Sequence, residues 1–312
     1  MATVYEHIKS NNRKTMLLLA LFPTVLIALI FLIVFVALSF AAEPGQSAIG
    51  GALSVAVSVA IPVAGTALIW MLISWAFGDS MMLSVAGARQ IHEDEKEYRP
   101  LFQAVQNVAL AAGLPMPKVY IIDDDGMNAF ATGRAPTDAS VAFTRGIVRT
   151  LDRAELEGVI AHEMAHVGNR DIRMDVLIIT GLGCTIFIAD IILRMAFSGG
   201  GSNGKNKGQA QAVLLMVWCA FVLFNFVIAP ILHMAVSRKR EYLADATGAF
   251  ITRNPRALAS ALSKISGNPR VRPVDGNRAM ARAFIADPRK NFSGLFATHP
   301  PIEERVKRLN DM

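Results

Sequence analysis

Two histidines and a glutamate stand in the short stretch AHEMAH, residues 161–166, at a spacing that suits metal chemistry. Because residues four apart share one face of an α-helix, the rings of His162 and His166 can reach a single ion from the same side. Zinc binds histidine nitrogen at about 2.0–2.1 Å. Glu163 lies beside that face and can reach a water that zinc activates without being a ligand itself. The stretch predicts a hydrolytic zinc centre; the alternative is a pair of ordinary helical histidines.

A catalytic zinc site needs a third protein ligand and one open position. In the metzincin class a glycine and a third histidine follow shortly, but here those positions hold Asn169 and Ile172. A carboxylate on a later helix is the other option, and residues 240–245 (REYLAD) supply one. We predict Glu241 as the third ligand and Asp245, one helical turn further, as the acceptor of the second ring N–H of a ligating histidine. The alternative for Glu241 is a solvated surface charge.

These side chains require helices and a frame that holds the helices together. The motif helix is expected to begin near Asp152, since Glu155 follows at the capping-box spacing. Residues 99–113 carry apolar side chains at helical spacing and predict a further helix. Three short strands separated by turn-forming residues predict a small antiparallel meander; they cover residues 118–123, 128–133 and 140–145. The predicted fold class is α+β and predominantly α.

The chain is far more apolar than a soluble protein of its length. Hydrophobic residues make up 53 % of its 312 residues and charged residues 18 %, against roughly 25 % charged in a typical soluble domain. Residues 16–42 and 49–77 contain no charged side chain, and each run is longer than the roughly 20 apolar residues that cross a bilayer. Two weaker apolar runs cover residues 176–193 and 212–236. We predict a polytopic membrane protein with about four transmembrane helices; the alternative for the last two runs is a hairpin that enters the bilayer only in part.

Basic residues set the predicted orientation. Lysine and arginine precede the first apolar run and follow the second, whereas the connector at residues 43–48 has neither. By the positive-inside rule, the N-terminus and the chain from Gly78 onward face the cytosol. The net charge is +6, and several of the basic residues flank apolar runs. We therefore expect contact with the lipid bilayer and no nucleic-acid partner. Two cysteines, both in apolar stretches, predict no disulfide.

The predicted organisation alternates between membrane and cytosol. Residues 1–77 form an N-terminal segment and transmembrane hairpin, and residues 78–175 a first catalytic part with the motif helix. Residues 176–236 form a second membrane hairpin, and residues 237–312 a second catalytic part with the third ligand. The two halves of the zinc site then emerge from adjacent membrane helices, and we expect the packing of those helices to fix the geometry of the metal.

Several segments together resemble the HtpX-type membrane zinc metallopeptidases, gluzincins related to the prenyl-protein peptidase Ste24. The similarity rests on residues 128–133 (NAFATG), 155–166 (ELEGVIAHEMAH), 237–245 (SRKREYLAD) and 298–301 (THPP), with Arg305. It implies a zincin-like catalytic domain at the cytosolic face of the bacterial cytoplasmic (inner) membrane, with one Zn²⁺ per chain. It also implies protein quality control and a stress response, through ATP-independent cleavage of misfolded or damaged membrane proteins and of unfolded proteins.

The resemblance further assigns residues outside the zinc motif. The strand with Asn128, Ala129 and Phe130 would lie beside the cleft and pair with extended substrate backbone. His299 would donate a hydrogen bond to the developing oxyanion. Arg305 would orient the carboxylate partner of a ligating histidine, or the C-terminal helix. The alternatives are plain packing for the strand and a satisfied loop histidine for His299.

Three other functions stay open at this point, and the oligomeric state is open as well. A zinc-binding membrane scaffold without turnover would use the same ligands. A small transporter would use Asp190 and Asn225, which are polar residues within the apolar runs. A prenyl-protein peptidase would use the same chemistry, but the small number of candidate spans favours the quality-control type.

Overall fold

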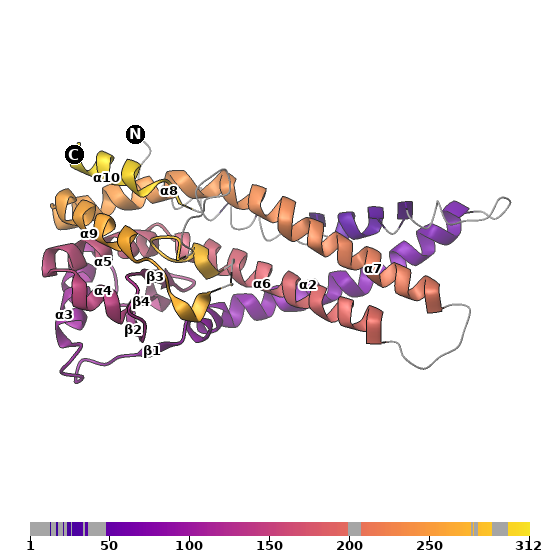
Figure 1. Ribbon diagram of the computed structural model, residues 1–312, viewed down its shortest axis with the longest axis horizontal. Coiled ribbons are helices and arrows are strands. Elements are labelled where there is room, and N and C mark those ends of the chain that lie inside the picture. Colours follow the sequence, from indigo (N-terminus) through magenta and orange to yellow (C-terminus); the bar gives the residue numbers. More distant parts are fainter. Residues whose placement is uncertain are drawn as a thin grey trace. The chain divides into compact units, whose positions relative to one another are not determined.

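The computed structural model describes the backbone of residues 48–198, 207–275, 277, 280–288 and 299–312, together with some residues between 13 and 36. Their internal contacts define two compact units. One unit includes residues 77–180 and 233–312, and the other includes residues 16–76 and 181–232. All four strands and every predicted site residue belong to the first unit (Figure 1).

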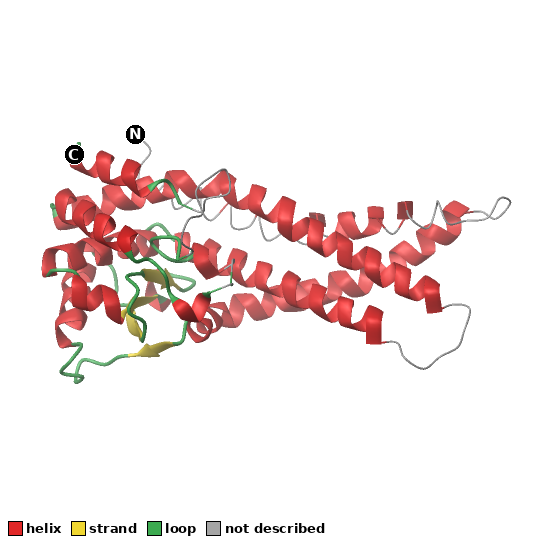
Figure 2. Ribbon diagram, viewed as in Figure 1, coloured by secondary structure: helices red, strands yellow, loops and turns green. Residues whose placement is uncertain are grey.

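Helices dominate the first unit, and a small sheet lies among them (Figure 2). The predicted class, α+β and mostly α, is therefore confirmed. The helices are α3 (Arg99–Ala112), α4 (Arg145–Thr150), α5 (Arg153–Gly168), the first turns of α6 (Asp171–Ser198), most of α8 (Ala229–Thr252), α9 (Pro255–Gly267) and α10 (Ile302–Asn310). The strands are β1 (Ala88–Gln90), β2 (Lys118–Ile122), β3 (Ala129–Thr132) and β4 (Ser140–Thr144). Short 3₁₀ turns lie at Pro136–Asp138, Arg272–Val274 and Met280–Arg282.

The sheet is mixed, so the prediction of an antiparallel meander was wrong. The strand order is β1-β2-β4-β3, with β2 parallel to β4 and β3 antiparallel to β4 at one edge. Strand β1, which was not predicted, is antiparallel to β2 at the other edge. The side chains of β3 and β4 are buried at every position. This burial on both faces is typical of strands covered by helices, whereas a half-exposed meander would alternate between buried and exposed residues.

Long-range bonds explain why β2 does not turn directly into β3. Asp124, in the loop after β2, accepts hydrogen bonds from the backbone of Gly126 at 2.8 Å and of Arg272 at 3.1 Å. Asn128 donates to the carbonyl of Pro269 at 2.8 Å. The loop is therefore tied to a segment well over a hundred residues later, and no tight turn between neighbouring strands forms.

Helix α5 begins as the capping-box spacing predicted. The Asp152 side chain accepts a hydrogen bond from the Glu155 backbone at 2.9 Å, and the Glu155 side chain accepts one from the Asp152 backbone at 2.9 Å. Glu155 also accepts from Ser260 at 2.6 Å and pairs with Lys264 at 2.7 Å, both on α9. One carboxylate thus caps the motif helix and attaches it to its neighbour.

Helices α5 and α8 approach each other closely at the first histidine of the motif. A Cβ atom added to Gly248 on α8 would lie 3.0 Å from the backbone nitrogen of His162, so a side chain there would push the two helices apart by a few tenths of an ångström. This approach brings residues of α8 one and two turns before Gly248 beside the ligand face of α5. The other side of α5 faces α3 and α9, where Leu101, Val105 and Leu262 are buried.

The second unit is helical throughout its described residues. It contains most of α2 (Ala48–Val85), the rest of α6, α7 (Lys207–Leu223), a π-helical turn at Phe224–Ile228 and the start of α8. Within the described residues, α6 is the one helix that is long and apolar enough by itself to cross a membrane. Helix α2 is a second candidate span if its pieces Ala64–Trp70 and Leu72–Val85, which are bent by 45° relative to each other, are counted together. Much of the predicted first span, residues 16–42, lies outside the described residues, so four spans stay a prediction.

Removal of the Glu155 side chain tests the cap of the motif helix. We expect Glu155→Ala to lower the free energy of unfolding by about 2–4 kcal/mol, because a cap and charge-assisted hydrogen bonds are lost together. Chemical unfolding of the purified protein in detergent measures this. The matched control is Glu157→Ala, which removes an exposed ion pair with Arg153 from the same helix and should cost less than about 1 kcal/mol. Equal losses in the two variants would contradict the assignment.

Candidate metal centre and active site

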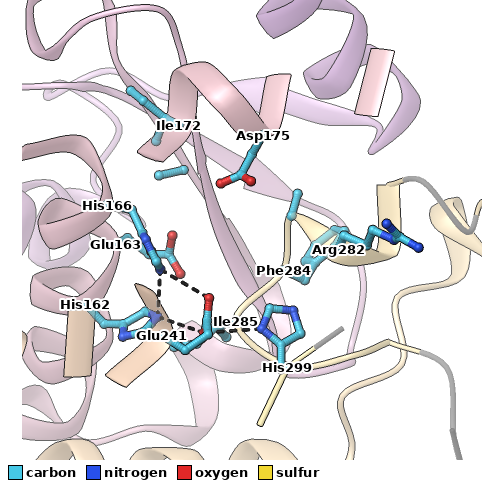
Figure 3. Close-up of a pocket in the computed structure, with 12 residues that line it drawn as sticks. His162, Glu163, His166, Ile172, Asp175, Glu241, Arg282, Phe284, Ile285 and His299 are labelled. Carbon is cyan, nitrogen blue, oxygen red and sulfur yellow. Dashed lines mark hydrogen bonds and ion pairs between the residues drawn. The ribbon is translucent and has the colours of Figure 1, made fainter. Parts of the chain in front are cut away.

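Three possible ligand atoms converge from helices α5 and α8. The Nε2 atoms of His162 and His166 lie 3.2 Å apart. The Glu241 carboxylate faces both, with one oxygen 3.8 Å from His162 Nε2 and the other 3.7 Å from His166 Nε2 (Figure 3). The three residues form a cluster able to hold a metal ion, with all ligand atoms within 4.8 Å of one another. The structure thus brings together the three predicted ligands.

The second nitrogen of each ring faces a carboxylate. His162 Nδ1 lies 3.0 Å from Asp245 on α8, and His166 Nδ1 lies 3.0 Å from Asp171 at the start of α6. A carboxylate at Nδ1 favours the tautomer with the proton on that atom, which leaves the Nε2 lone pair for a metal. The contact with Asp245 was predicted, whereas Asp171 was missed. The one signal in the sequence was an acidic side chain just after the motif helix.

The arrangement of these atoms fits a cation. With protons on both Nδ1 atoms, the two Nε2 atoms and the Glu241 carboxylate are all acceptors, and they face one another. Glu241 Oε2 is buried and has no hydrogen bond of standard geometry. Two nitrogens bound tetrahedrally to one zinc ion lie about 3.3–3.4 Å apart, close to the observed 3.2 Å. The adjoining cavity of about 20 Å³ is large enough for one water molecule.

The charges around the two rings differ. Burial lowers the pKa of His162 and outweighs the effect of Asp245, so this ring is neutral near pH 7. Burial also acts to lower the pKa of His166, but the hydrogen bond to Asp171 and the charge of Glu241 outweigh it and raise the pKa to about 9. A metal ion that binds here therefore displaces a proton from His166.

The two carboxylates on α8 are ionised. Burial acts to raise the pKa of Glu241, yet the neighbouring His299, Arg305 and His166 hold it well below its usual range. Burial likewise acts against Asp245, but Arg305 lowers the pKa of that carboxyl to about 2. The cluster thus offers a permanent negative charge to a cation.

Glu163 is buried beside the cluster and holds its proton more tightly than an ordinary glutamate. Burial raises its pKa to about 7, and the charge of Glu241 adds to this effect. The backbone N–H of Ala131, on edge strand β3, acts in the opposite direction. A carboxyl whose pKa lies near neutrality is suited to accept a proton and return it within one reaction cycle.

Arg305 is fully buried at the back of the cluster. Its guanidinium donates two hydrogen bonds to Asp245, at 2.8 and 2.7 Å, and one to the carbonyl of Ile285 at 2.9 Å. Helix α10 therefore supplies the charge that holds Asp245 in place against His162. The contact with Asp245 is the one that the predicted orienting role of Arg305 needs, and the role itself stays a prediction.

The family model "Peptidase family M48" matches residues 95–312, which is more than half of the sequence. The chain belongs to peptidase family M48. A "Protease HtpX homolog" of Thermoanaerobacter pseudethanolicus is 39 % identical over 313 residues, covering 99 % of this chain and 98 % of the relative. One of Tropheryma whipplei is 43 % identical over 243 residues, covering 77 % of this chain and 81 % of the relative.

This M48 peptidase is therefore a metalloprotease of HtpX type, as the resemblance in its sequence implied. Among solved structures, the crystal structure of S. mikatae Ste24p is similar over 81 % of this chain and 64 % of that chain. Its TM-score of 0.43 and sequence identity of 17 % are too low to carry a conclusion.

The cleft of the M48 peptidase receives only one residue of the predicted substrate strand. Ala131 lines it, together with Phe284, Ile285 and residues of the metal cluster. Asn128, by contrast, is fully buried, and its amide group bonds to the backbone of Pro269 and Ala286. Asn128 thus has a structural contact that the sequence did not reveal, and substrate binding by its side chain is not supported. The side chains of Ala129 and Phe130 are buried as well.

His299 lies at the edge of the metal cluster in this peptidase. Its Nδ1 atom is 3.2 Å from Glu241 Oε2, and its side chain is 10 % exposed. Neither ring nitrogen has a hydrogen bond of standard geometry. The predicted role of His299 stays a prediction, while its position beside the third ligand and in the lining of the cleft is plain in Figure 3.

Loss of the Arg305 charge tests how the metal cluster is supported. We expect Arg305→Met to lower the free energy of unfolding by about 3–5 kcal/mol, because it leaves Asp245 buried without its partner. Arg308→Met is the matched control on the same helix. Arg308 is half-exposed and covers the Tyr242 ring at 3.8 Å, so its loss should cost about 1 kcal/mol. The same unfolding assay measures both, and a tolerated Arg305→Met would refute the role assigned to this ion pair.

Proposed function

We propose that this chain is a zinc-dependent membrane endopeptidase that cleaves misfolded or damaged membrane proteins at the cytosolic face of a bacterial inner membrane. The observation that supports the chemistry is the convergence of His162, His166 and Glu241, with a carboxylate behind each ring. Two histidines and a glutamate are a typical catalytic zinc set, because they leave the fourth position open.

The residues around the cluster have separate tasks in peptide hydrolysis. A bound zinc ion supplies a Lewis acid that polarises a carbonyl and lowers the pKa of water. Glu163 accepts the proton of the attacking water and delivers it to the leaving amine. Its pKa of about 7 suits both transfers. Asp245 and Asp171 hold the two imidazole rings in the ligating tautomer.

Backbone geometry at β3 supports binding of an extended substrate. Asn128 accepts a hydrogen bond from Thr144 on β4, so the next residue, Ala129, turns its peptide groups to the side of the strand away from β4, where Ile285 donates to the Ala129 carbonyl at 2.9 Å. By the alternation of strand residues, Ala131 also turns its N–H and carbonyl to that side. A substrate backbone is proposed to add to this edge beside Glu163.

His299 is proposed to assist the oxyanion that forms during attack. Its ring lines the cleft on the side opposite His162 in Figure 3, and it contacts Glu241 through Nδ1 alone. The Nε2 atom is then the ring nitrogen left to face a substrate oxygen.

The membrane location rests on the relatives and on the apolar helices. Helix α6 passes the length and hydropathy test for a span, and the sequence contains further apolar runs. We propose a multi-pass protein with the N-terminus and the active site in the cytosol, as the distribution of basic residues favours. Damaged membrane proteins are the proposed substrates because they expose unpaired backbone near such a site.

The other candidate functions receive less support. The two polar residues a transporter would use have local partners: Asn225 accepts from Thr185 at 2.8 Å, and Asp190 pairs with Arg194 at 2.7 Å. A prenyl-protein peptidase would share the chemistry, but the relatives that cover the whole chain are named HtpX homologues. A scaffold without turnover would not need a buried Glu163 with a raised pKa.

Replacement of Glu163 separates turnover from metal binding. We expect Glu163→Gln to lower kcat/KM for an unfolded protein such as casein by about 10²–10⁴-fold, the usual contribution of a general base. Bound zinc should stay near one ion per chain, because Glu163 is not a ligand. Protease assays and metal analysis on the same detergent preparation measure the two quantities.

Glu157→Gln is the control for this variant, since Glu157 lies on the same helix and, within the described part of the chain, forms an ion pair with Arg153. Full activity of Glu163→Gln would overturn the assignment of the base. A wild-type protein that holds zinc and cleaves nothing would favour the scaffold.

Replacement of a ligand tests the metal site itself. We expect His166→Ala to lose most of its zinc and its activity, because two remaining ligands hold the ion poorly. The exposed His92 provides the control His92→Ala, which should keep both. In the wild type, 1,10-phenanthroline should abolish proteolysis and added Zn²⁺ should restore it. Undiminished zinc in His166→Ala would remove this residue from the ligand set.

A further inference from the structure

A buried series of charged side chains extends from His166 to residues outside the zinc motif. Behind His166 lies Asp171, and behind Asp171 lies Arg240 of helix α8. The same order of groups, arginine then aspartate then imidazole, occurs at His162 with Arg305 and Asp245. The two ligating rings thus have the same order of supporting groups, with an arginine–aspartate distance of 2.7 Å at Arg305 and 3.6 Å at Arg240.

Of the two ligating imidazole rings, Asp171 contacts that of His166. Its side chain is 1 % exposed, and its Oδ2 atom lies 3.0 Å from His166 Nδ1. Its other oxygen, Oδ1, faces Arg240 at 3.6 Å. A buried carboxylate is costly unless a charge or hydrogen bond compensates it, and Asp171 obtains compensation from both sides.

Arg240 connects Asp171 to the third ligand. It precedes Glu241 in the chain, so one turn of α8 carries both residues. Its guanidinium also makes two hydrogen bonds to Asp175 on the next turn of α6, at 3.0 and 3.3 Å. The planar guanidinium thus faces two carboxylates at the start of α6, Asp171 and Asp175, and Asp171 is the one that contacts His166.

The turn between α5 and α6 makes the contact with His166 feasible. Helix α5 ends at Gly168, and Arg170 adopts a left-handed backbone with φ of 59°. This reversal lets Asp171 begin α6 beside His166, five residues earlier in the chain. A non-glycine residue in this conformation costs about 1 kcal/mol or more, and the buried Asp171 contacts offset that cost.

We propose that Asp171 and Arg240 form a positioning pair that aims His166 Nε2 at the metal and sets its distance from Glu241. The proposal rests on the proposed function, since it takes His166 as a zinc ligand. Neither residue touches substrate or metal in this account. Asp171 acts through the ring, and Arg240 acts through Asp171.

Zinc affinity of the full-length protein in detergent tests the pair, with Zn²⁺ alone as the probe in competition with a fluorescent chelator. We expect Asp171→Asn to weaken Zn²⁺ binding by about 10–100-fold, the usual effect of losing a carboxylate behind a ligating histidine. Asp175→Asn is the matched control. It removes a carboxylate that pairs with the same Arg240 but does not contact His166, so the loss should not exceed about fivefold.

The visible spectrum of the Co²⁺-substituted protein separates positioning from general stability. Asp171→Asn should shift the absorption bands of the ion because the ligand orientation changes, whereas Asp175→Asn should leave them unchanged. Arg240→Lys keeps the positive charge but loses the planar guanidinium. Introduced into the wild type, it should weaken Zn²⁺ binding. Introduced into Asp171→Asn, it should weaken Zn²⁺ binding no further. If Asp171→Asn does not accumulate as folded protein, Arg240→Lys carries the same affinity and spectral test.

Wild-type Zn²⁺ affinity and spectrum in Asp171→Asn would overturn the proposal, and so would equal losses in Asp171→Asn and Asp175→Asn. Additive effects of Arg240→Lys and Asp171→Asn would show that Arg240 does not act through Asp171. A wild-type protein that binds no zinc would instead overturn the proposed function, so the two failures are distinguishable.

Discussion

The mutual orientation of three buried acceptors is the constraint on which the catalytic unit depends. Once His166 has lost the proton that a metal displaces, two imidazole nitrogens 3.2 Å apart and one ionised carboxylate do not attract one another. They stay together because carboxylates fix the far side of each ring and guanidinium groups fix those carboxylates. The protein thus maintains an arrangement that is unfavourable by itself and favourable around a cation, which is how a preformed metal site differs from a surface cluster of charges.

Backbone packing supplies the second part of this constraint. Helices α5 and α8 carry the three candidate ligands, and Gly248 allows their close approach because it has no side chain at the point where it meets His162. Glu155 anchors α5 to α9 at the other end of the same helix. The ligand atoms therefore depend on helix placement at two points, one at the first histidine of the motif and one at the N-terminal end of α5.

Local spacing was enough to predict the parts of the site that lie within single helices. The capping box at Asp152, the histidine pair on α5 and the carboxylate pair on α8 each follow from a three- or four-residue repeat. The sheet order could not be predicted, because it depends on contacts such as that of Asn128 with Pro269, 141 residues away. Asp171 was missed for a related reason. Its contact with His166 requires the left-handed residue Arg170 between two helices, and no helical repeat specifies such a turn.

The separation of the charged partners along the chain has a consequence for biosynthesis. His162 is made first, Asp245 follows, and Arg305 is translated 143 residues after His162 and 60 after Asp245. Until the ribosome has passed that position, Asp245 has no guanidinium to neutralise it and the first imidazole has no fixed partner. A nascent copy of this protease accordingly lacks a finished centre until Arg305 has been translated.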